Sequence, residues 1–168
     1  MKSLKFIWPL GLFGFLVTAP EAHATDPSIY LTEAAGSVCQ PRAGLGSANY
    51  TNFGRIQNEH TTQQLQMDCP VPFMVDRSYG DPLHVYVNLT GNGSNISCTA
   101  FVEKLTALPS SPDFFSAFAS TSAVGATQLS MSLNVFEGLS DGVLHVFCTL
   151  PAKTASGAAE VRGFTVLD

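Results

Sequence analysis

Apolar and polar residues alternate repeatedly along this chain, and no segment longer than a turn or two has helical periodicity. The alternation is clearest at Leu83–Leu89 and Leu129–Val135, and a shorter run covers 64–68. A period of two is typical of a strand with one side on a core and the other toward water. The sequence therefore predicts an all-β fold.

Further strands are expected at Ile96–Glu103, Val143–Leu150 and Val161–Leu167. Val143–Leu150 is apolar on both sides, which predicts a central position in its sheet. Turn residues at 91–95 and 137–142 join adjacent predicted strands and favour hairpins. About seven or eight short strands of this kind indicate an antiparallel β-sandwich or a jelly-roll-like module.

The segment 106–127 is rich in Ser, Thr and Ala and lacks this clear alternation. Ser111 followed by Pro112 is a good helix start, so we expect a short helix near 112–118. Phe115 and Phe118 would then share one side of the helix and plug an end of the sandwich. The alternative is an exposed aromatic loop that binds a ligand.

Residues 1–24 have the pattern of a secretory signal peptide. Lys2 and Lys5 precede the apolar run Phe6–Ala19, and the small-x-small sequence at 22–24 follows it. This run is short for a membrane span, which needs about 20 residues, so an uncleaved anchor is the less favoured alternative. We expect residues 25–168 to form a single domain that is secreted or periplasmic and has no membrane span.

The four cysteines, Cys39, Cys69, Cys98 and Cys148, all follow the predicted signal. An even number of cysteines in an exported chain implies two disulfides, with three possible pairings. We favour Cys39–Cys69 with Cys98–Cys148, because the second pair lies in two segments that look like neighbouring strands. A four-cysteine zinc site is the weaker alternative, since no two cysteines are closely spaced.

The formal net charge is −5, and 12% of the residues are charged. A nucleic-acid partner is therefore not expected, because phosphate neutralisation requires a basic surface. The glycines at 91 and 93 lack both a third glycine at the required place and a following helix, so they do not form a dinucleotide loop. The sequence contains no indication of a cofactor.

Three patterns resemble chemical sites. Gly138–Gly142 matches the Gly-x-Ser-x-Gly elbow of serine hydrolases, but a strand is expected on each side of Ser140 rather than a strand and a helix. His84 and His145 would suit a metal pair on one sheet face, although solvent-facing histidines are the favoured interpretation. Asp76 and Asp81 are weak candidates for a calcium loop, because the recurrent spacing of such loops is absent.

Several short motifs carry a resemblance to a known group of proteins. They are Cys39-Gln40-Pro41, Cys69-Pro70-Val71-Pro72, Ser97-Cys98-Thr99, Cys148-Thr149-Leu150-Pro151 and Gly163-Phe164-Thr165-Val166. Together they resemble uncharacterised small exported two-disulfide β-domain proteins of Gram-negative bacteria. The resemblance implies a bacterial, exported β domain and supplies no activity.

The favoured hypothesis is a non-catalytic exported protein that acts through its surface in envelope structure, adhesion or protein interaction. Its partner is an unidentified protein or glycan, and edge-strand pairing would be a natural mode of contact. The second hypothesis is a carbohydrate-binding module that uses Tyr79, Tyr86 and Phe101. Against it, the chain's one tryptophan, Trp8, lies in the predicted signal. A secreted hydrolase that uses Ser140 or an unrecognised carboxylate pair is the third.

Overall fold

A computed structural model describes residues 36–42, 46–51, 54–75, 82–104, 114–134 and 142–167. Within these ranges the chain forms a short 3-10 helix, η1, and ten strands, whose bounds are η1 (Gly36–Val38), β1 (Gln40–Pro41), β2 (Ala48–Tyr50), β3 (Ile56–Asn58), β4 (Leu65–Val75), β5 (Leu83–Asn92), β6 (Ile96–Lys104), β7 (Phe114–Thr121), β8 (Val124–Leu133), β9 (Gly142–Leu150) and β10 (Glu160–Leu167).

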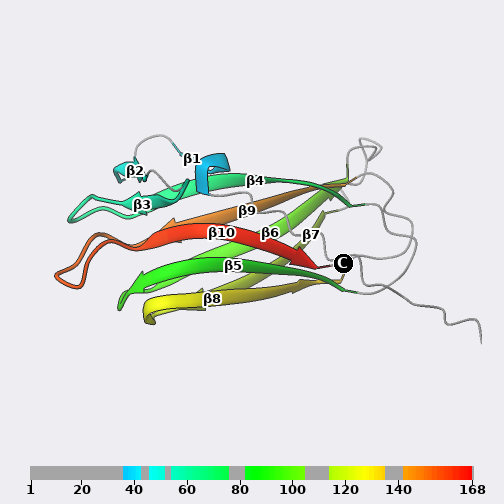
Figure 1. The fold of residues 1–168 in the computed structure, drawn as a ribbon. Helices are drawn as coiled ribbons and strands as arrows, with labels where there is room; N and C mark the ends of the chain where they lie inside the picture. The colour runs from blue at the N-terminus through cyan, green and yellow to red at the C-terminus, as the bar shows by residue number, and fades with distance from the viewer. Residues whose placement is uncertain are drawn as a thin grey trace, which may run out of the picture.

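The strands form two antiparallel five-stranded sheets packed face to face (Figure 1). The first sheet has the order β1-β4-β9-β6-β7, and the second has the order β2-β3-β10-β5-β8. The predicted antiparallel β-sandwich is confirmed. The described strands outnumber the seven or eight expected, because β1, β2 and β3 are too short to show alternation in the sequence and β7 was expected to be a helix.

The core is formed by alternate residues of the strands, as the sequence pattern predicts. Every second residue is buried from Leu83 to Gly91 in β5 and along the whole of β9, and the residues between them face outward. The largest fully buried side chains come from both sheets and include Phe164, Ile56, Leu65, Met67, Leu83, Leu89, Ile96, Leu144 and Leu150. Burial of such side chains contributes about 1.5–3 kcal/mol each, so this shared layer holds the two sheets together.

The predicted central position of Val143–Leu150 is confirmed, because β9 pairs with β4 on one side and β6 on the other. The two predicted hairpins are wrong. The turn at 91–95 leads from β5 in the second sheet to β6 in the first, and β8 and β9 likewise lie in different sheets. Turn residues specify that the chain reverses, but the sheet that receives the next strand depends on long-range packing.

The short helix expected near 112–118 is also wrong from Phe114 onward, where the chain forms β7; Ser111 and Pro112 lie outside the described residues. β7 pairs with β6 along its whole length, from Ile96 opposite Thr121 to Glu103 opposite Phe114. This ladder overrides the local helix-start signal. Consequently, Phe115 faces the core and Phe118 faces solvent, rather than sharing one side.

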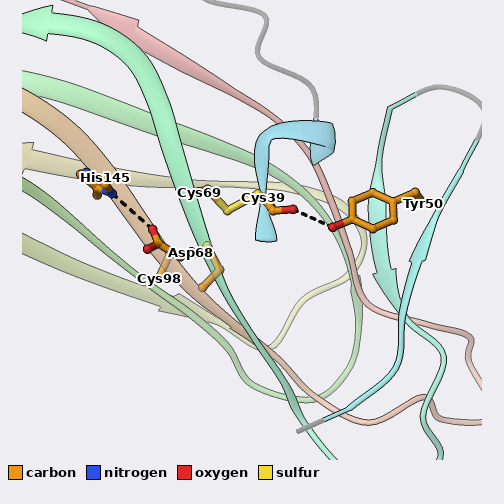
Figure 2. Close-up of a disulfide and its surroundings, with 7 residues drawn as sticks. Cys39, Tyr50, Asp68, Cys69, Cys98 and His145 are labelled. Atoms are coloured by element: carbon orange, nitrogen blue, oxygen red, sulfur yellow. Dashed lines mark hydrogen bonds and ion pairs between the residues drawn. A yellow bond between two sulfur atoms is a disulfide. The ribbon is translucent and has the colours of Figure 1, made fainter. Parts of the chain in front are cut away.

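Both predicted disulfides are present, and the zinc alternative is wrong because the four thiols are consumed in them. Cys98 and Cys148 lie directly opposite each other on β6 and β9. Cys39, immediately before β1, bonds Cys69 of β4 (Figure 2). All four side chains are buried, so both cross-links join neighbouring strands of the first sheet from its core side.

The two lateral sides of the sandwich differ. On one side the sheets end in the short strands β1 and β2, and the Tyr50 hydroxyl from β2 donates a hydrogen bond of 2.8 Å to the Cys39 carbonyl (Figure 2). On the other side the sheets end in the long strands β7 and β8, which lie against each other.

The predicted signal segment 1–24 lies outside the described residues. Within the described ranges, no helix is long and apolar enough to cross a membrane.

Candidate functional site

A row of stacked rings lies on the outer face of the first sheet. Leu144, Val146 and Cys148 of β9 point into the core, which leaves His145 and Phe147 on the outer side. Phe101 of β6 lies directly opposite His145. The Phe101 ring centroid is 5.2 Å from that of His145, with 10° between the planes, and 4.9 Å from that of Phe147, with 6° between the planes.

Charged groups extend this row. The Arg42 guanidinium carbon lies 4.1 Å from the centroid of the Phe147 ring, a cation–π contact of about 0.5–1 kcal/mol at an exposed site. Asp68 Oδ1 of β4 lies 3.3 Å from Nδ1 of His145 (Figure 2). Because the two side chains are 34% and 26% exposed, this pair contributes no more than about 1 kcal/mol.

Next to the row, toward Ser97 and Thr99 of β6, the outer face is rich in hydroxyl groups, and Glu103 is exposed on the same side of β6 beyond Phe101. Phe118 of β7 is 66% exposed and lies opposite Thr99, two residues from Phe101 on β6. Ser116 and Ser120 flank it on β7 and are also exposed. Apolar ring surface beside hydroxyl groups suits a ligand that presents both C–H surfaces and hydroxyl groups. We call Phe101, Phe118, His145 and Phe147 the aromatic face.

The outer face of the second sheet carries a separate and smaller aromatic group. His84 and Tyr86 of β5 stack with 6.4 Å between ring centroids. Tyr86 lies between Thr165 of β10 and Ser130 of β8. On this face the Gln128 amide donates a hydrogen bond of 2.9 Å to the Asn88 side-chain oxygen.

The structure therefore separates residues that the sequence analysis grouped. Tyr86 and Phe101 lie on opposite outer faces and cannot contact one ligand of ordinary size together. The expectation that His84 and His145 could share a sheet face is wrong for the same reason. The chain crosses between sheets after β5 and after β8, so strands that look adjacent in the sequence belong to different layers.

The remaining sequence candidates, Tyr79, Asp76, Asp81 and Ser140, lie outside the described residues. The chain is described again from Gly142, where it forms the strand β9, as expected, whereas a hydrolase elbow requires a helix after the serine. Among the residues that the structure places, no group of three His, Cys, Asp or Glu side chains could hold a metal ion.

Sequence reasoning missed Phe147 as a member of the aromatic face and Asp68 and Arg42 as its neighbours. It named Phe118 only as part of a helical plug or of an exposed aromatic loop. Alternation within Val143–Leu150 could have placed Phe147 beside His145, because residues two apart in a strand share a side. No local signal links Asp68 to His145 across 77 residues, since their contact depends on the pairing of β4 with β9.

No family model and no curated protein matches this chain. Among solved structures, this chain is similar to the CBM22-1–GH10 modules of a Clostridium thermocellum endo-1,4-β-D-xylanase, which were solved in complex with xylohexaose. The alignment has a TM-score of 0.46 and 14% sequence identity, and it covers 81% of this chain and 27% of the xylanase chain. A family 11 carbohydrate-binding module from the same organism, in complex with a β-1,3-1,4-mixed-linked tetrasaccharide, aligns with a TM-score of 0.41 and 10% identity over 76% of this chain and 86% of the module.

A family two carbohydrate esterase from Cellvibrio japonicus aligns with a TM-score of 0.38 and 11% identity over 80% of this chain. This chain spans 32% of the esterase and 27% of the xylanase, so it corresponds in length to a part of each.

Proposed function

We propose that this protein is a non-catalytic, exported β-sandwich that acts through its surface, and that its aromatic face binds a neutral glycan. The observation that carries the proposal is the exposed Phe118 ring beside the stacked Phe101, His145 and Phe147. Aromatic surface accepts the C–H side of a sugar ring, and the hydroxyl groups of Ser97, Thr99, Ser116 and Ser120 supply hydrogen bonds at its border.

The extent of the face and the net charge of the chain favour an extended neutral glycan as the ligand. The face spans β9, β6 and β7 of one sheet, so several sugar units have room to lie across it. The chain's net charge of −5 disfavours polyanionic ligands. The glycan ligands in the names of the structural neighbours belong to those proteins, and the proposal for this chain rests on its own side chains.

Export is part of the proposal. The predicted signal segment at 1–24 and the two disulfides both support an oxidising compartment, because cytosolic thiols are kept reduced. The secreted and periplasmic locations remain equal alternatives. The test is to fractionate the producing cell and map the N-terminus of the mature chain, for which we expect cleavage after Ala24.

The binding test uses the oxidised mature protein with soluble neutral polysaccharides, namely xylan, mixed-linked β-glucan and hydroxyethyl cellulose, in affinity electrophoresis and calorimetry. We expect one of them to bind and Phe118→Ala to weaken binding at least about 10-fold, which corresponds to about 1.4 kcal/mol. Tyr86→Ala is the matched control, because it removes a half-buried ring from the opposite outer face and should leave the affinity unchanged.

Three outcomes would contradict the proposal. If no neutral polysaccharide binds at millimolar sugar concentration, the glycan assignment is wrong. If binding survives Phe118→Ala but is lost on Tyr86→Ala, the ligand occupies the second sheet. Labelling of Ser140 by a serine-directed covalent probe would contradict the non-catalytic part.

A further inference from the structure

The two lateral sides of the sandwich are protected very differently. β1 has two residues and β2 has three, and Tyr50 ties them together. On the opposite side, β7 has eight residues and β8 has ten. Within the described parts of the chain, no further strand pairs with the outer side of either. Their outward backbone N–H and C=O groups therefore form a long template for another strand.

This long edge lacks the features that usually block strand addition. Residues 114–134 contain no Asp, Glu, Lys, Arg or Pro. The described register shifts lie in the β4–β9 and β10–β5 pairs, whereas β7 and β8 run in regular register with their neighbours. Natural edge strands are normally kept apart by charged residues, prolines, bulges or short length, and the described β7 and β8 show none of these.

Side chains at the same edge are incompletely covered. The inward side chains of Phe115, Ala117 and Ala119 on β7 are half-buried, whereas the inward side chains of β9 are at most 2% exposed. Val124, at the start of β8, is 71% exposed. Additional apolar surface would therefore be buried if a strand were added here.

We infer that the β7/β8 edge binds the same edge of a second copy of this chain. A twofold axis normal to the sheets would pair β7 antiparallel with its counterpart and bring β8 alongside its own, so that both sheets continue across the seam. Two copies with a net charge of −5 repel each other over most of their surfaces. At this uncharged edge no like charges meet, which makes it the side where self-association is least opposed.

The inference is independent of glycan binding, and it is tested without a ligand. The mature protein at about 100 µM is examined by size-exclusion chromatography with light scattering, together with Ser116→Glu/Ser120→Glu. Both residues point outward on β7, so the fold tolerates the change. In an antiparallel self-pair near the middle of β7, they approach residues 120 and 116 of the other copy and set like charges against each other.

The control is Thr61→Glu/Gln64→Glu, which adds the same charge at exposed positions between β3 and β4, on the other lateral side of the sandwich. We expect the wild type and the control to have twice the mass of one mature chain, and the β7 variant to have the mass of one chain with the circular dichroism spectrum of the folded wild type. Its melting temperature should equal that of the wild type diluted to the monomer, because self-association stabilises the native state.

A second measurement covers the case in which the variant fails to fold. Hydrogen exchange of the wild type should show protection of β7 and β8 amides that falls on dilution to about 1 µM. A monomeric wild type at 100 µM, a dimer that survives the β7 substitutions, or exchange in β7 and β8 that does not depend on concentration would each overturn the inference.

Discussion

At the scale of single residues, the buried Asn58 organises one end of the sandwich. Asn58 is fully buried, and its amide nitrogen donates to the carbonyls of Gln63 and Pro151, at 2.8 and 2.9 Å. Its side-chain oxygen accepts from the backbone N–H groups of Ser47 and His60, at 3.3 and 3.1 Å. One side chain therefore satisfies backbone groups of three separate segments that converge on β3.

Substitution of Asn58 tests this role. Asn58→Ala leaves buried donors and acceptors without partners, at about 1–3 kcal/mol each where water cannot replace the side chain. We expect the free energy of unfolding to fall by at least about 2 kcal/mol in urea titrations.

The control is Asn49→Ala at an exposed position on β2, where a change within about 0.5 kcal/mol is expected. Equal stability of the two variants would mean that the buried hydrogen bonds of Asn58 contribute nothing net.

The sequence predicts residue orientations well and residue contacts poorly. Alternation in Leu83–Leu89 correctly separates buried from outward positions, because a strand has a fixed period of two. Asn58 looks like an ordinary polar loop residue in the sequence, because its partners are up to 93 residues away. The Asp68–His145 pair is likewise not predictable from the sequence, because the two residues are 77 positions apart.

At the scale of elements, close contact between β5 and the start of β8 depends on a glycine. A Cβ atom on Gly91 would lie 2.1 Å from the carbonyl oxygen of Ala123. The same carbonyl accepts a 3.2 Å hydrogen bond from the Gly93 N–H. The turn that carries the chain from the second sheet to the first therefore packs directly on the backbone between β7 and β8.

Gly91→Ala should accordingly destabilise the fold by about 1–3 kcal/mol, because the backbone of Ala123 must move to accept the methyl group. Chemical denaturation measures this loss.

Ser132→Ala, at an exposed position on β8, serves as the comparison and should change stability little. A neutral or stabilising effect of Gly91→Ala would show that this junction has more room than the structure allows.

Strands are predictable from the sequence where their inward side chains are large, apolar and buried. β5 has a long alternating pattern, β9 is a continuous apolar run, and the sequence places both of these strands closely, together with β6 and β10. β7 fails because its inward positions Ala117 and Ala119 are small and its outward positions include Phe118, so the apolar pattern is blurred. The strand forms because β6 offers a complete hydrogen-bonding edge, which no local window of sequence reveals.

At the scale of the whole molecule, the disulfides act on the first sheet alone. Cys98–Cys148 closes a loop of sequence separation 50, and Cys39–Cys69 closes a loop of sequence separation 30. In the chain-entropy model, these closures stabilise the fold by about 4 and about 3.5 kcal/mol. The pairing was predictable because the flanking segments have strand patterns, although the position of both bonds in one sheet was not.

Removal of one cross-link measures its contribution. Cys98→Ala/Cys148→Ala should lower the free energy of unfolding by about 4 kcal/mol while the circular dichroism of the folded state remains that of a β protein.

Because all four cysteines are buried, we also expect dithiothreitol to reduce the wild-type bonds only as fast as the protein opens, as followed by thiol labelling. Fast reduction under native conditions, with the spectrum unchanged, would contradict this expectation.

The placement of the two cross-links also determines how the protein would respond to a pulling force on its ends. The chain between Cys39 and Cys69 and the chain between Cys98 and Cys148 are closed loops that cannot be drawn out without breaking a covalent bond. The residues before Cys39, the segment from Cys69 to Cys98 and the segment after Cys148 lie outside these loops and can extend, and the last two contain β5 and β10 of the second sheet. Under tension, β5 and β10 would be drawn out of the second sheet, while the chain inside the two loops would not lengthen. Within the first sheet, β1 would remain fastened to β4 and β6 to β9.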